Sequence, residues 1–185
     1  MRKNQIFIIN GSGGVGKDAF IEMINLIASN QNIRIGNYSS VAKVKDIAKI
    51  IGWNGEKSER DRKFLSDLKL LTTEYNNMPL NDMKRYANNF MNVVDKDDAR
   101  ILFLHIREPE EISKAVKEFK KISKVKTILV KRDAIKHITS NMADENVYNY
   151  DYDIIINNNG TLEDLKEKAK HFLNDFLNNK LRNEY

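Results

Sequence analysis

Apolar residues occur along this chain in short runs that are separated by longer segments with helical spacing. The runs occupy residues 4–10, 32–39, 100–106, 125–131 and 152–157. Short runs of this kind, bounded by polar segments, are typical of strands, and near-continuous ones such as "ILFL" are typical of strands covered on both faces. The pattern therefore predicts a five-stranded parallel sheet.

The segments between these runs predict amphipathic helices. Their apolar positions recur at helical spacing in the following sets: Phe20, Ile24 and Ile27; Val44, Ile47, Ala48 and Ile51; Phe64, Leu68, Leu71 and Tyr75; Ile112, Ala115, Val116, Phe119 and Ile122; and Leu165, Phe172 and Phe176. Pro79 is expected in the first turn of another helix that runs to about Val93, and Thr161 with Asp164 predicts a capping box. Alternating strands and helices indicate one α/β domain over residues 1–185, with helices on both faces of the sheet.

A glycine-rich loop, "GSGGVGKD", follows the first apolar run and precedes a helical segment. It fits the phosphate-binding pattern G-x-x-x-x-G-K, in which backbone N–H groups surround phosphate oxygens at the start of a helix. Lys17 is expected over the β- and γ-phosphates of ATP. The predicted ATP-binding residues are Gly11, Ser12, Gly13, Gly14, Val15, Gly16, Lys17, Asp18 and Ala19.

Asp18 occupies the position where this loop normally has Ser or Thr. The usual hydroxyl binds Mg²⁺, and a carboxylate is also a hard oxygen ligand for that ion. We therefore expect Asp18 to face magnesium, directly or through water. The alternative is that Asp18 only caps the helix.

A Gly-Lys-Asp ending resembles the loops of phage and bacterial deoxynucleoside monophosphate kinases, and also that of animal phosphomevalonate kinase. Residues 38–68 are similar to the first family's segment after its second strand, which places Lys45, Trp53, Arg60 and Arg62 at comparable positions. "FLHIREPEEI" is similar to its Asp-Val-Arg-Phe-Pro-Asn-Glu stretch and supplies Arg107 and Glu111. "DYDIIINNNGTLEDL" resembles the last strand and closing loop of related small-molecule kinases, dephospho-coenzyme A kinase included. One departure is His105, which stands where that family has an aspartate that helps to hold magnesium.

The resemblance implies a P-loop NTPase fold with a small lid, and a kinase that uses ATP and Mg²⁺ on a small phosphorylated acceptor, foremost a (deoxy)nucleoside monophosphate. Basic side chains are the main tools of phosphoryl transfer, which makes Lys17, Arg107 and Arg132 the candidate catalytic residues. The helical region 41–95 would bind the acceptor through Lys45, Arg60 and Arg62, and residues 131–151 would form the lid. Asn159 and Gly160 would line the path of the adenine.

Several alternatives remain open in the sequence. Arg107 could pair with Glu110 or Glu111, the basic residues at 60 and 62 could belong to a solvated face, and the lid segment could be a plain surface loop. The acceptor could be another phosphate, such as phosphomevalonate, and the loss of an acid at His105 keeps a non-catalytic ATP-binding module in consideration. A homodimer is neither required nor excluded.

Charge and composition narrow the partners. Lys plus Arg exceed Asp plus Glu by 31 − 26 = 5, but the basic residues alternate with acidic ones, which argues against nucleic-acid binding. No apolar run approaches the length of a membrane span, and the chain contains no cysteine. We expect no membrane partner and a cytoplasmic location.

Overall fold

The computed structural model describes residues 3–93, 99–133 and 146–185. Its centre is a parallel sheet with the strand order β2-β3-β1-β4-β5. The strands are β1 (Asn4–Asn10), β2 (Ile33–Ser39), β3 (Ala99–His105), β4 (Lys124–Lys131) and β5 (Ile154–Asn157). The five predicted strands and the parallel α/β, P-loop-type fold are thereby confirmed.

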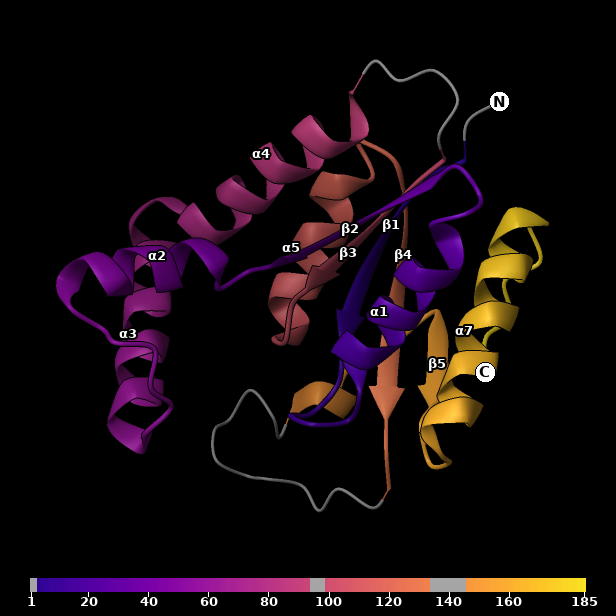
Figure 1. Ribbon diagram of the computed structural model, residues 1–185. Helices are drawn as coiled ribbons and strands as arrows, with labels where there is room; N and C mark the ends of the chain where they lie inside the picture. The colour runs from indigo at the N-terminus through magenta and orange to yellow at the C-terminus, as the bar shows by residue number, and fades with distance from the viewer. Residues whose placement is uncertain (1–2, 94–98, 134–145) are drawn as a thin grey trace.

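Helices cover both faces of this sheet (Figure 1). Helices α1 (Lys17–Ala28) and α7 (Leu162–Leu177) lie side by side on one face, where Phe7, Phe103 and Phe172 belong to the core. Helices α4 (Met78–Met91) and α5 (Pro109–Phe119) cover the opposite face over a second core that includes Ile8 and Leu104. The strands are near-continuously apolar because both of their faces are covered.

Helices α2 (Ala42–Ile51) and α3 (Glu59–Asn76) pack beside α4, away from the sheet (Figure 1). The helical spacing there is confirmed, but three of its apolar residues face solvent instead of a core: Ile51 is 62% exposed, Leu71 63% and Tyr75 85%. The reason is that α3 contacts other helices along only part of its surface and covers no sheet face. Amphipathic spacing determines which residues share one face of a helix, but the elements packed against the helix determine whether that face is buried.

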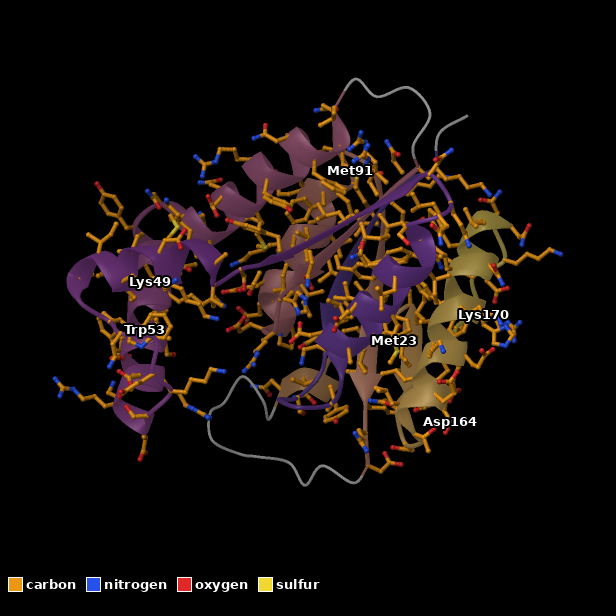
Figure 2. All side chains as sticks on the ribbon, viewed as in Figure 1. Met23, Lys49, Trp53, Met91, Asp164 and Lys170 are labelled. Carbon is orange, nitrogen blue, oxygen red and sulfur yellow. The ribbon has the colours of Figure 1, made fainter. Side chains whose placement is uncertain are left out.

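Two local predictions near the carboxyl end of the chain have different outcomes. The capping box at the start of α7 is present, since the Thr161 hydroxyl and the Asp164 carboxylate each accept a hydrogen bond from the other residue's backbone N–H. Figure 2 labels Asp164 near that end of the helix. The fifth predicted strand, residues 152–157, is shorter than expected, because β5 begins only at Ile154. The chain before it forms a short 3-10 helix, η1 (Asn146–Tyr148). None of the helices in the described ranges combines the length and apolar character needed to cross a bilayer.

Candidate phosphate-binding site

The glycine loop connects the carboxyl end of β1 directly to the start of α1, as its sequence context predicts. Two of its positions require glycine. Gly11 has φ +145, and a Cβ there would lie 2.3 Å from the carbonyl oxygen of Val130. Gly16 has φ +98, and a Cβ there would lie 2.4 Å from Asn158 Nδ2. The loop is thus held against β4 and against the turn after β5 at distances that no side chain would permit.

Asparagine side chains hold both ends of this loop. Asn10 accepts from the Gly11 N–H at 2.8 Å and donates to the Arg107 carbonyl at 2.8 Å and to Tyr152 Oη at 2.7 Å. Buried Asn158 donates to the carbonyl of Val15 at 2.8 Å. Sequence reasoning missed both asparagines. Both asparagines stand at recognisable places, one at the end of the first strand and the other in the "NNN" run that follows the last strand. Their hydrogen-bond partners, however, are distant in sequence.

Two polar side chains within the loop are placed to meet an anion. Lys17 Nζ donates to the carbonyl oxygens of Gly11, at 2.5 Å, and Ser12, at 2.8 Å. Ser12 Oγ is buried and has no hydrogen-bond partner among the described residues. An unsatisfied buried hydroxyl is costly, and a phosphate oxygen would satisfy it. A flexible ammonium, an orphaned hydroxyl and a helix N-terminus together fit a polyphosphate.

Asp18 and His105 lie side by side at this edge of the sheet. Asp18 is in the first turn of α1 with its side chain 90% exposed, and its Oδ1 lies 3.7 Å from Nε2 of His105, the last residue of β3. No side chain caps α1, whose N-cap is Gly16, so hydrogen-bonded capping does not explain Asp18. His105 Nε2 is 2.8 Å from Asn37 Oδ1 on β2.

The imidazole of His105 is neutral at physiological pH. Burial lowers its pKa from 6.5 to about 4, and the positive charges of Lys17 and Arg107 act in the same direction, against the opposing effect of the Asp18 carboxylate. A neutral His105 that shares Asn37 Oδ1 donates from Nε2. The edge therefore holds one carboxylate beside one neutral imidazole.

These residues fit Mg²⁺ in the way that phosphate-transferring sites use it. In the described part of the chain no three His, Asp or Glu side chains form a cluster that would hold a metal by themselves. Mg²⁺ in such sites is bound by one or two carboxylates, with phosphate oxygens and water completing its shell. The exposed carboxylate of Asp18, beside the loop, suits that arrangement.

The other predicted nucleotide-side residues follow strand ends at the same edge. Arg107 lies exposed two residues after β3, and half-buried Arg132 directly follows β4. Asn159 exchanges hydrogen bonds with Asp133, donating to its carboxylate at 2.6 Å and accepting from its N–H at 2.8 Å. At Gly160 a Cβ would lie 2.4 Å from Asp164 Oδ2, so this turn packs closely on the start of α7.

A buried lysine that the sequence did not single out ties α3 to α5. Lys69 is 8% exposed, and its Nζ lies 2.6 Å from Glu108 Oε2 and 2.8 Å from Glu111 Oε2. Burial raises the pKa of Glu111, and the neighbouring Glu108 carboxylate adds to that effect. Burial is also the largest single effect on Glu108 and raises its pKa, but the charge and the hydrogen bond of Lys69, together with further hydrogen bonds, outweigh it and hold the pKa below its usual value. Glu111 therefore pairs with Lys69. From the sequence alone, Glu111 was considered only as a partner of Arg107.

The predicted acceptor-binding residues lie apart from the loop's hydrogen-bond network. Lys45 is exposed on α2, and Arg60 and Arg62 are exposed at the start of α3, where Arg62 Nε donates to the Lys57 carbonyl at 3.2 Å. In Figure 1 that end of α3 is directed toward the side on which β1 and β4 end. Most of the predicted lid, residues 134–145, lies outside the described residues.

Solved structures share this fold over nearly the whole chain. The crystal structure of APE1195 superposes with a TM-score of 0.51 at 13% identity, covering 92% of this chain and 97% of that one. A provisionally assigned kinase from Chloroflexus aurantiacus gives a TM-score of 0.51 at 11% identity, covering 95% and 98%. A sugar kinase from a Janibacter species gives 0.47 at 11% identity, covering 97% and 99%. No protein-family model and no curated protein sequence matches the chain. At these identities the likeness concerns the fold.

Proposed function

We propose that this protein is an ATP- and Mg²⁺-dependent phosphotransferase whose acceptor is a (deoxy)nucleoside monophosphate. The observation that carries the proposal is the loop between β1 and α1, where Lys17 and the orphaned Ser12 hydroxyl face a helix N-terminus. The fold is shared with a protein described as a kinase, which supports phosphoryl transfer as the activity. The acceptor class rests on the resemblance of residues 38–68 and 103–112 to deoxynucleoside monophosphate kinases.

In this proposal the nucleotide's charge is balanced by residues at the carboxyl edge of the sheet. Loop amides and Lys17 hold the β- and γ-phosphates, and Asp18 holds the magnesium ion. Arg107 and Arg132 stabilise the charge of the phosphoryl group while it is transferred. An oxygen of the acceptor phosphate attacks the γ-phosphorus, the bond from that phosphorus to the bridging oxygen breaks, and ADP leaves with the electron pair.

The acceptor phosphate would be bound from the α2–α3 side by Lys45, Arg60 and Arg62, and Asn159 and Gly160 would lie along the adenine. His105 adds no positive charge because its imidazole is neutral. It contacts Asn37 on β2 through Nε2 at 2.8 Å. Asp18 is then the carboxylate that faces the metal.

A panel of acceptors tests this function. Purified protein with ATP and Mg²⁺ is offered nucleoside monophosphates, sugar phosphates and phosphomevalonate, and ADP release is followed in a coupled assay. We expect a nucleoside monophosphate to raise ADP formation well above the rate with ATP alone. Lys17→Ala should abolish this activity, whereas Lys170→Ala, on the exposed side of α7, should retain it.

The same assay separates the two rivals. Turnover with phosphomevalonate alone would assign the enzyme to a different acceptor. ATP-dependent thermal stabilisation that Lys17→Ala removes, without a phosphorylated product from any acceptor, would instead favour a non-catalytic ATP-binding module. The neutral His105 in place of an acid is the observation that favours this second rival.

A further inference from the structure

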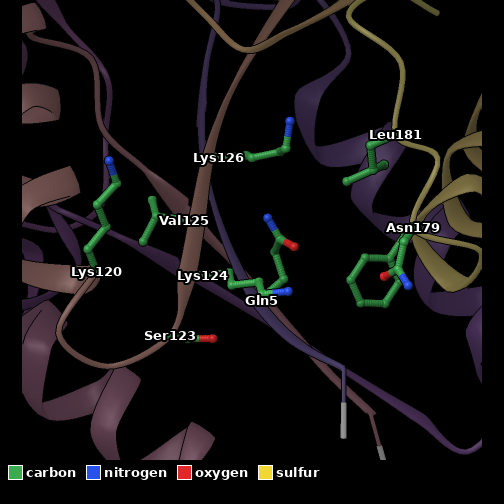
Figure 3. A pocket seen from close by; sticks show the side chains of 9 residues that line it. Gln5, Lys120, Ser123, Lys124, Val125, Lys126, Asn179 and Leu181 are labelled. Carbon is green, nitrogen blue, oxygen red and sulfur yellow. The ribbon is translucent and has the colours of Figure 1, made fainter. Parts of the chain in front are cut away.

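One hollow in the described structure does not adjoin the glycine loop. It measures about 680 Å³ and lies where β1 and β4 begin, between β4 and the segment that follows α7 (Figure 3). Gln5 in its wall is the second residue of β1, whereas the loop follows the seventh residue of that strand. At about 3.3 Å per strand residue, the hollow lies roughly 15–20 Å from the loop. It is therefore a separate feature of the molecule.

The charged side chains that line the hollow are all basic. Lys120, Lys124 and Lys126 belong to the end of α5 and the start of β4, and no acidic residue is among the lining. Within residues 3–93, 99–133 and 146–185 these three lysines have no ion pair or hydrogen bond through their side chains. Other lysines do pair: Lys63 lies 2.8 Å from Asp67, and Lys84 lies 2.6 Å from Glu118. The concentration of unneutralised ammonium groups favours an anion in the hollow.

The Gln5 amide faces the same space. The residue is 8% exposed, and its side chain has no hydrogen-bond partner among the described residues. In Figure 3 its amide lies on the same side of β4 as Lys126, facing Asn179 and Leu181 across the hollow. Adjacent pairing of Gln5 with Lys124 in the sheet places the two side chains together. The Gln5 amide atoms are not among the fully buried unpaired atoms, so the amide N–H groups are accessible to a ligand that accepts hydrogen bonds.

We propose that this hollow, named here the amino-edge site, binds a small organic phosphate. Several lysines and an amide donor suit a group with two or more negative charges and several acceptor oxygens better than a single carboxylate. The volume exceeds that of one phosphate group and falls in the range of small-molecule sites. Leu181 supplies an apolar wall against which the organic part of the ligand can lie. The site is independent of the phosphate-binding loop and of the proposed transfer reaction.

The test uses full-length protein carrying Lys17→Ala, so that the loop does not compete for the probe. Pyrophosphate, glucose 6-phosphate and AMP are titrated separately, and amide NMR shifts and calorimetry are recorded. We expect saturable binding with shifts of the Gln5 and Asn179 side-chain amides. Adding Lys124→Gln and Lys126→Gln should weaken binding about tenfold or more, since two charge-assisted contacts to the phosphate are lost.

A matched pair of substitutions distinguishes a site from general charge. Lys166→Gln with Lys170→Gln removes the same charge from the exposed side of α7 and should leave the affinity unchanged. Leu181→Trp, which narrows the hollow without altering charge, should also weaken binding. Tightest binding of pyrophosphate would point to an inorganic ligand, and tightest binding of AMP or the sugar phosphate to an organic one. Unperturbed Gln5 and Asn179 amides, or equal losses in both lysine pairs, would overturn the proposal.

Discussion

Replacing His105 by Gln should change how the stability of the protein depends on pH. Gln keeps an N–H donor that can reach Asn37 Oδ1, but it cannot take up a proton in this range. The groups that act on the imidazole charge are Lys17, Arg107 and Asp18, in addition to burial. The side chain of His105 is 16% exposed, so solvent screens these effects only in part.

The sign and size follow from the lowered pKa. The unfolded chain binds a proton at His105 near pH 6.5, whereas the folded protein resists it down to about pH 4. The free energy of unfolding is therefore unaffected by the titration of His105 above pH 6.5, and it decreases as the pH falls toward 4. Lowering the pKa from 6.5 to about 4 corresponds to about 3 kcal/mol in total. Linkage gives a loss on the order of 1 kcal/mol near pH 5.5 and roughly 2–3 kcal/mol near pH 4.5.

Urea unfolding of the wild type and His105→Gln between about pH 7.5 and pH 4.5, in EDTA and without nucleotide, measures this difference. The wild type should lose more stability on acidification than the variant, by the amounts given above. His171→Gln is the matched control, because its ring is exposed on α7, and it should follow the wild type. Parallel curves for the wild type and His105→Gln would refute the reasoning, because they would mean that His105 takes up its proton equally in both states.

Three further substitutions test the rest of the fold and site. Gly11→Ala should destabilise by at least about 2 kcal/mol and abolish ATP binding, because φ is +145 and the added Cβ meets backbone at 2.3 Å. Gly13→Ala, where the added Cβ meets no protein atom within 4 Å, should be as stable as the wild type. Lys69→Met should lower the free energy of unfolding by about 2–3 kcal/mol, because two partly buried carboxylates lose their cation. The exposed Lys63→Met should cost less than about 0.5 kcal/mol. Thr161→Ala should lower the free energy of unfolding by about 1 kcal/mol, because the capping box at the start of α7 is lost.

Urea titration provides each stability value, and calorimetry with ATP and Mg²⁺ provides the binding values. Retained ATP binding in Gly11→Ala would contradict the close approach of the loop to β4. Equal costs for the two lysine substitutions would show that burial adds nothing to the Lys69 network. A capping variant as stable as the wild type would mean that the box at the start of α7 is redundant.

The strands and the glycine loop between β1 and α1 were predictable because their signals are local. Each strand is a continuous apolar run, and the loop's glycines, its lysine and the following helix are consecutive in sequence. The burial of α2 and α3 was not predictable in this way. Ile51 and Tyr75 have the spacing of a core-facing stripe, yet they are exposed because the helices that carry them pack beside α4 and cover no strand.

The contacts that hold the site together join residues that are far apart in the chain. Asn158 reaches Val15 across a sequence separation of 143, and Asn10 reaches Arg107 across 97. A single sequence gives no means of pairing such residues, since an Asn beside a glycine run is equally compatible with an ordinary turn. For the same reason Lys69 was indistinguishable from the other lysines of α3 until its two glutamates on the α5 side were located.

The departures at positions 18 and 105, which are separate in the sequence, are one local arrangement in space. Asp18, where the G-x-x-x-x-G-K pattern is normally followed by Ser or Thr, is in the first turn of α1, and His105 ends β3, with 3.7 Å between the two side chains. Two carboxylates at this distance would repel each other, and one of them would be driven toward its protonated form. Because the imidazole is neutral, His105 adds no second negative charge beside the Asp18 carboxylate. This edge of the sheet therefore has one carboxylate, which the helix carries, with an uncharged ring as its neighbour on the strand.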